Sequence, residues 1–526
     1  MKPIDGAFLG TVLILGGYLL GRGLEFLGLL PQIGYVLAGT ALGFATGAPF
    51  VVRIFAPLVG FLLFYLGYVA SERRLTAAPF QLILVQPART IVGTAIFFPF
   101  FFLLTGHVGT SFALAVLMST SSALVLKWGK NTSYGRVEQS ILAMDALITA
   151  IAIVALTEGG NPLAIAVLVG VYALMILVPN PTANIITLVA LYAIAELTKT
   201  WSLLAWPFVF LLGVFIHHAV SRHHTIDEIA MEILPALVLL GIGASIALVD
   251  ATTPLWAIIL LILSGIQNFI TLVILGPALA ISPKSGAHIA IRTLGPSEGA
   301  VFAAAILGLP QMAAAIALFY LVALLVESGA KTEKDADKLM SIVLGGLWKK
   351  IEALELEYLP IMVRKHILFS EAYVKHVRPR LMALIVSLLV AIAAGYLLAY
   401  AIIAAPIMYR TAIIFLGVTA GVLALLKMIS TYFDVVRTSL EFLSHHGYRG
   451  KLRFGKSPEL FVGGYLAMLI GFMLLTVGTP VLNLMVMFLA MLLISVGLLL
   501  MLHNYAKIYR ELHRKKDYAL SVSRAG

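Results

Sequence analysis

The chain has 526 residues, of which 61% are hydrophobic and 12% are charged, and it contains no cysteine. Soluble proteins carry about 25% charged residues, so this composition excludes a soluble globular protein and indicates a polytopic membrane protein. The lack of cysteine excludes disulfides, thiolate metal sites and redox-active thiols. The net charge of +11 does not indicate nucleic-acid binding, because the Lys and Arg residues gather in short segments between apolar runs.

Apolar runs bounded by Gly, Pro or charge predict seventeen membrane spans in an all-α fold. Thirteen lie near residues 6–26, 31–48, 52–69, 86–105, 110–128, 138–156, 161–178, 182–197, 203–219, 229–249, 254–278, 286–308 and 310–327, and four more lie near 381–404, 409–428, 460–478 and 481–503. The pattern divides the chain into a thirteen-helix transmembrane domain at 1–327, a charged cytoplasmic segment at 328–380, four additional transmembrane helices at 381–503 and a basic cytoplasmic tail at 504–526.

The basic residues between the spans predict the orientation of the chain. If the N-terminus lies outside the cell, the loops that follow odd-numbered spans are cytoplasmic, and nearly all Lys and Arg residues then fall on the cytoplasmic side. Only Lys2, Arg53, Lys199 and Arg410 clearly lie outside. We therefore expect a multi-pass protein of the plasma membrane with its N-terminus outside and its C-terminus in the cytoplasm.

The segment 328–380 alternates charged with apolar residues. Leu339, Ile342, Val343, Leu347 and Trp348 are followed directly by two lysines. This pattern favours amphipathic helices that lie at the cytoplasmic surface of the bilayer. A solvated linker that contains short helices is the alternative.

Asp145 lies in the middle of the span 138–156, and no Lys or Arg is found within one helical turn of it. Ionisable groups at membrane depth are costly and usually line an ion pathway. A carboxylate in this position can take up a proton or act as a hard oxygen ligand for Na⁺ or K⁺, but not both at once. The alternative is a purely structural Asp that is hydrogen-bonded to a neighbouring helix.

Two clusters of poor helix formers interrupt predicted spans. Ser119, Thr120, Ser121 and Ser122 lie in the fifth span, and the sequence 292–299 lies in the twelfth. Irregular backbone at this depth is tolerated where it lines a cavity, although a small-residue packing face is the alternative for the first cluster. An offset of seven spans reverses the membrane direction, so the breaks indicate two inverted repeats with a shared midplane site, as in secondary transporters.

With these residues identified, the first 327 residues resemble the monovalent cation/proton antiporter superfamily, in particular its sodium/proton exchanger and potassium-efflux-like branch. The second span is similar to the family signature L-P-x-x-x-G-Y-x-x-A-G-x-x-x-G, and the third to F-x-x-G. Segments of both interrupted spans resemble S-S-T-A-V-V-L-K and L-G-x-x-S-E. These matches are Leu30–Gly43, Phe64–Gly67, Ser121–Lys127 and Leu294–Glu298.

The resemblance implies a membrane transporter and not an enzyme, with two broken helices that cross, H⁺ and Na⁺ or K⁺ as its substrates, no cofactor, and a homodimeric assembly. It places Asp145 and the hydroxyl residues of the first break at the ion-binding site. The residues expected to support the broken helices are Arg292, Gly295, Pro296, Ser297, Glu298, Gln267 and Asn268.

Two departures from the family pattern affect the predicted mechanism. Met144 precedes Asp145 where electrogenic members have a second acid, and Gln267 and Asn268 stand where those members have a Lys. A single carboxylate predicts electroneutral, one-for-one exchange. The same losses leave open a non-transporting subunit that scaffolds a larger complex. An organic-anion symporter ranks lower, because no cation lies near Asp145 in the sequence.

Histidines form a weaker signal. A role in pH sensing or metal binding is conceivable for them, but adjacent histidines do not share a helix face, and ordinary polar residues at the membrane surface are the simpler interpretation. These are His217, His218, His223, His224, His445 and His446.

Overall fold

The structure is a computed structural model. It describes residues 3–70, 75, 79–122, 135–157, 161–220, 224–274, 281, 283–330, 332–346, 348–349, 351, 371–403, 405 and 407–445, with a few single residues after 445. The helices are α1 (Pro3–Phe26), α2 (Gln32–Thr46), α3 (Ala48–Val69), α5 (Pro79–Thr105), α6 (Val108–Ser119), α7 (Gly135–Thr157), α8 (Pro162–Leu177), α9 (Pro181–Leu197), α10 (Trp201–Val220), α11 (His224–Ile246), α12 (Thr253–Asn268), the π-helix η3 (Phe269–Ile274), α13 (Pro283–Arg292), α14 (Glu298–Ile306), α15 (Pro310–Ser328), α16 (Glu333–Leu344), α18 (Glu371–Ile403) and α19 (Ile407–His445).

Local sequence explains where several of these helices begin. In α8 and α9 a Pro occupies the first helical position, where its missing N–H costs no hydrogen bond. The preceding residues, Asn161 and Asn180, cap the free N–H groups with their side-chain oxygens. Asn-Pro pairs therefore mark the turns between adjacent spans.

Within the described part of the chain, seven helices are long and apolar enough to cross a membrane. They cover Ala88–Thr105, Val137–Thr157, Trp201–Val220, Thr253–Ile274, Pro310–Ser328, Val377–Ala401 and Tyr409–Met428, and shorter apolar helices lie between them. The regular elements of the described residues are all helices, and the protein is a multi-pass membrane protein, as the composition predicts.

Each of the first fifteen predicted spans overlaps described helix, and the run 286–308 is divided into α13 and α14. The runs 460–478 and 481–503 and the tail lie outside the described residues. Two helices extend past their predicted spans. α18 begins at Glu371, ten residues before the span 381–404, and α19 continues to His445, past the span 409–428. Hydropathy marks where a helix leaves lipid, whereas Lys, Arg and Glu are good helix formers and prolong the helix into water.

Glycines bring the helices that surround the site into close contact. A Cβ atom on Gly39 of α2 would collide with the carbonyl oxygen of Leu240 on α11, and one on Gly67 of α3 would collide with that of Phe210 on α10. Small residues allow backbones to approach this closely in membranes. Gly39 and Gly67, which lie in the segments Leu30–Gly43 and Phe64–Gly67, are therefore helix-packing positions.

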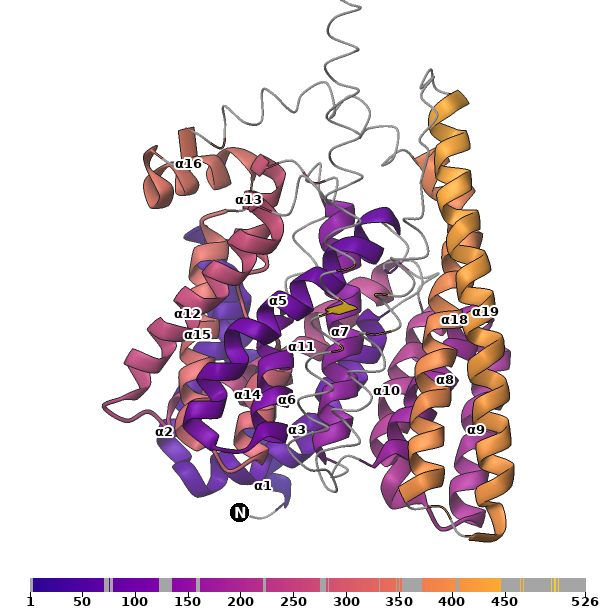
Figure 1. Ribbon diagram of the computed structural model, residues 1–526. Coiled ribbons are helices and arrows are strands. Elements are labelled where there is room, and N and C mark those ends of the chain that lie inside the picture. Colours follow the sequence, from indigo (N-terminus) through magenta and orange to yellow (C-terminus); the bar gives the residue numbers. More distant parts are fainter. Residues whose placement is uncertain are drawn as a thin grey trace, which may run out of the picture.

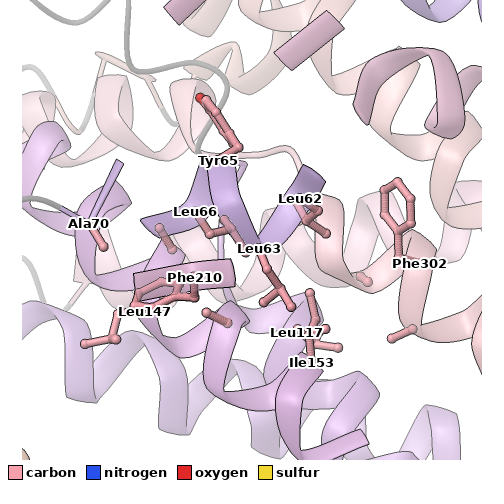
Figure 2. Packing of buried hydrophobic residues seen from close by; sticks show 14 of the residues in the cluster. Leu62, Leu63, Tyr65, Leu66, Ala70, Leu117, Leu147, Ile153, Phe210 and Phe302 are labelled. Atoms are coloured by element: carbon pink, nitrogen blue, oxygen red, sulfur yellow. The ribbon is translucent and has the colours of Figure 1, made fainter. Parts of the chain in front are cut away.

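The helix α3 lies at the centre of the buried core. Leu62, Leu63 and Leu66 of this helix pack among residues of α6, α7, α10 and α14 (Figure 2). α18 packs against α8, and α19 packs against α18, so the added helices flank one side of the bundle (Figure 1). The two breaks lie among the helices α5, α6, α7, α12 and α14.

Candidate ion-binding site at two helix breaks

The two predicted interruptions meet in space. α6 ends at Ser119, and the backbone is extended at Thr120. The segments 120–122 and 295–297 then run side by side as an isolated antiparallel bridge between Ser121 and Pro296. Backbone groups that the helices leave unpaired are thus satisfied by the opposite break and not by lipid. The hydrogen bonds are Ser122 N–H to Gly295 O (3.2 Å) and Ser297 N–H to Thr120 O (3.0 Å).

Asp145 of α7 lies directly beside this bridge and is fully buried. The backbone N–H of Ser121 donates to Oδ2 of Asp145 at 2.8 Å. The side chain of Gln86 on α5 donates to Oδ1. Sequence analysis assigned Asp145 to the ion site, and the structure places it against the first break.

Arg89 of α5 contributes a second charge, which sequence analysis missed. Its Nη1 lies 2.7 Å from Oδ2 of Asp145, and the guanidinium is 2% exposed. The same group donates to Ser121 Oγ, to Asn268 Oδ1 at 3.2 Å and to Thr293 O at 3.3 Å. No Lys or Arg lies within one helical turn of Asp145, and its basic neighbour comes instead from α5 through the packing of the two helices. A signal existed: Arg89 is a cation within the predicted span 86–105.

The amides of α12 tie the two breaks together. Gln267 donates to Ser119 O at 2.9 Å, next to the first break. Asn268 donates to Thr293 O at 3.1 Å, next to the second. Both residues are expected to support the broken helices, and each donates to a backbone carbonyl beside one break.

The opposite face of the bridge carries Glu298, the first residue of α14, which is fully buried. Ser122 Oγ donates to Oε1 of Glu298 and lies 2.9 Å from the hydroxyl of Tyr320 on α15. Since consecutive side chains of an extended segment point to opposite sides, the Ser121 side chain meets Arg89 and the Ser122 side chain meets Glu298. Thr120 contacts Thr149 of α7 at 3.2 Å, on the same helix as Asp145.

Three further buried ionisable side chains lie around the second break. Arg292, at the end of α13, lies 3.4 Å from Glu138 of α7, with both side chains buried. Glu327 of α15 accepts a 3.4 Å hydrogen bond from the N–H of Gly295. Arg292 is among the residues expected to support the broken helices, whereas Glu138 and Glu327 enter the sequence prediction only as the ends of spans.

The histidines of α10 lie away from this site. His217 packs edge-on against Tyr68 at 5.0 Å, and Nδ1 of His218 lies 2.6 Å from the amide of Asn184. In the part of the chain that the structure describes, no three His, Asp or Glu side chains are grouped so as to hold a metal ion. The positions 223 and 446, and the side chains at 224 and 445, lie outside what is described.

Comparison with known proteins finds similarity among solved structures but no match by sequence. No family model and no curated protein matches the sequence. Among solved structures, the chain is similar to the sodium proton antiporter MjNhaP1 from Methanocaldococcus jannaschii, determined at pH 8. The sequence identity is 15% and the TM-score 0.40, over 65% of this chain and 99% of the other.

Proposed function

We propose that the chain is a secondary transporter that exchanges a monovalent cation, Na⁺ or K⁺, for H⁺ by alternating access. The observation that supports this function is a fully buried carboxylate, Asp145, at the junction of two interrupted helices. Interrupted helices expose backbone groups at membrane depth, and a carboxylate there is the usual pointer to an ion pathway.

The proposed ion site consists of Asp145 together with oxygen atoms of the run Ser119 to Ser122. Within this run, Ser121 contacts both Asp145 and Arg89, so an ion bound to Asp145 would rearrange its hydrogen bonds. A hard cation prefers such carboxylate, hydroxyl and carbonyl oxygens. Arg89 must then loosen its contact with Asp145 as the cation or the proton binds, because all three compete for the same oxygens.

The proposed exchange is electroneutral. Asp145 carries either one proton or one cation, and Arg89 keeps its charge in both states because a guanidinium does not lose its proton in proteins. The net charge of the site is therefore the same in the two directions of travel. In accord with the sequence resemblance, we further propose a homodimer in the plasma membrane, with the N-terminus outside and the C-terminus in the cytoplasm.

One observation favours a second candidate function, a non-transporting subunit that scaffolds a larger complex. Arg89 already supplies the cation that Asp145 attracts, and Gln86, Ser121 and Asn268 complete the hydrogen bonds of the pair. A pair satisfied in this way is also what a purely structural role requires.

Transport in proteoliposomes distinguishes the two functions. Purified protein is reconstituted with an internal pH dye, and a pulse of Na⁺ or K⁺ is applied outside. The exchanger predicts a cation-dependent pH change that Asp145→Asn abolishes and that Asp250→Asn, a change in a loop, leaves intact. If wild type gives no pH change with either cation and is purified with stoichiometric partners, the scaffold function is correct.

A further inference from the structure

The charged segment after α15 forms a helix, α16, that is bound to the second broken helix. Asp337 of α16 lies 2.7 Å from Nζ of Lys284 and 2.8 Å from Nε2 of His288, both on α13. One carboxylate thus holds two basic side chains of α13. Figure 1 shows α16 beside α13 at one end of the bundle.

Apolar contacts make this docking specific. Ala336 and Met340 of α16 are buried in a small core of their own with Ala287 and Ile291 of α13. Sequence analysis expected the apolar face of this segment to lie on lipid. In the structure Trp348 packs on α13 and η3 and Leu339 is partly buried beside it, whereas Ile342 is 71% exposed.

The ring of Trp348 stacks on His288, with ring centres 6.0 Å apart. The imidazole is therefore covered by an aromatic face and held at its edge by Asp337, and its side chain is 3% exposed. Asp337 is 31% exposed, so water reaches the pair from its side. Near His288 lie Asp337 on α16 and, along the same face of α13, Lys284 and Arg292, while η3 contributes the apolar Val273.

The same helix carries part of the ion site. Lys284, His288 and Arg292 recur every four residues and so lie along one face of α13. The residue after α13, Thr293, accepts hydrogen bonds through its carbonyl from Ser121 at 2.8 Å and from Arg89. Any movement of the breaks during transport has to move α13, and α16 resists that movement.

Histidine changes charge near neutral pH, with an ordinary pKa of about 6.5. Protonated His288 and Lys284 place two cations on Asp337, whereas neutral His288 leaves one ion pair and at most a neutral hydrogen bond. Hydrogen bonds between charged groups are about twice as strong as neutral ones. Acid therefore tightens the contact between α16 and α13, and alkali loosens it.

We propose that α16 is a proton-sensitive latch on α13, closed when protonated His288 binds Asp337 and released when His288 loses its proton. The latch would regulate the proposed exchange, so its functional role rests on the proposed function. The structural change at the latch does not depend on transport.

Amide hydrogen exchange of α13 in detergent-solubilised protein tests the latch directly. After correction for the intrinsic rates, protection of α13 should be about five- to tenfold higher at about pH 6 than at about pH 8. His288→Gln and Asp337→Asn should remove this pH dependence, and His288→Arg should keep the protection high at both pH values. Lys338→Gln, an exposed change on the next residue of α16, is the matched control and should behave as wild type.

Equal protection of α13 at the two pH values in wild type, or unchanged pH dependence in Asp337→Asn, overturns the proposal. In proteoliposomes, alkali on the α16 side should accelerate exchange by wild type more than exchange by His288→Gln. A protein that shows the latch but transports neither Na⁺ nor K⁺ disproves the proposed function and leaves the latch standing. A protein that transports Na⁺ or K⁺ but shows no pH effect on α13 disproves the latch and leaves the proposed function standing.

Discussion

The guanidinium of Arg89 on α5 meets the carboxylate of Asp145 on α7 at 2.7 Å, and both side chains are buried. Replacing one member of such a pair leaves an uncompensated charge in a medium that solvates it poorly. Replacing both charges changes the free energy of unfolding little. We expect Arg89→Gln to lower the free energy of unfolding by about 3–5 kcal/mol, and the double change Arg89→Gln, Asp145→Asn to regain most of the loss. Denaturant unfolding in detergent micelles measures both. A double variant as unstable as Arg89→Gln would contradict a paired role.

Charge balance gives a second prediction. Because Asp145 exchanges one proton for one cation, wild type should give no transport current on a solid-supported membrane while the internal pH dye still responds. An uncompensated charge would couple to the membrane potential by about 2.3 kcal/mol per 100 mV, so an imposed potential should leave the rate unchanged. A current that reverses with the cation gradient would require a second titrating group, and Glu298→Gln is then the variant to compare.

The contact between α2 and α11 gives a third prediction. Gly39→Ala places a methyl group against the carbonyl oxygen of Leu240, and we expect this overpacking to cost about 1–3 kcal/mol. Gly265→Ala on α12 is the matched control, since its Cβ would meet nothing within 4 Å. Thermal unfolding midpoints of the two purified variants check this difference. Equal midpoints would mean that α2 and α11 are not in close contact.

Asp250, in the loop before α12, gives a prediction about pH. Its Oδ1 accepts hydrogen bonds from the hydroxyls and backbone N–H groups of Thr253 and Thr252, at 2.8–2.9 Å. The Thr253 hydroxyl, followed by that of Thr252, holds the pKa of Asp250 below its ordinary value. The carboxylate therefore contributes stability above the ordinary pKa of about 3.9, and this contribution is lost as the pH falls through the lowered value.

The expected result is a lower thermal midpoint for Asp250→Ala than for wild type at neutral pH, with the difference closing in acid. Asp250→Asn keeps one oxygen acceptor and should fall between the two. A difference that stays constant down to acid pH would show that the loop carboxylate does not stabilise the start of α12.

The sequence predicts the spans and the two breaks because both depend on local chemistry. Apolar length sets a span, and the run from Ser119 to Ser122 or the pair Gly295 and Pro296 interrupts one. The expectation that the breaks meet rested on the inverted order of the spans, and the bridge between Ser121 and Pro296 agrees with it. The roles of these residues in ion binding stay predictions.

The partner of Asp145 could not be found by searching along its own helix. Arg89 is 56 positions away and reaches Asp145 only because α5 packs against α7. Its identity as a cation inside an apolar run was visible, but its partner depends on tertiary packing. Glu138 and Glu327 were missed for a related reason: a charge near the end of a span looks solvent-exposed in sequence, whereas neighbouring helices bury both residues.

The length of the hairpin formed by α18 and α19 has a mechanical consequence. At 1.5 Å per residue, the 39 residues of α19 extend about 58 Å, roughly twice the thickness of the hydrocarbon layer. Its apolar part, Tyr409–Met428, accounts for about half of that length. The rest of the helix continues beyond this apolar part, and α19 packs against α18 (Figure 1). A helix of this length projects beyond the hydrocarbon layer at any ordinary tilt.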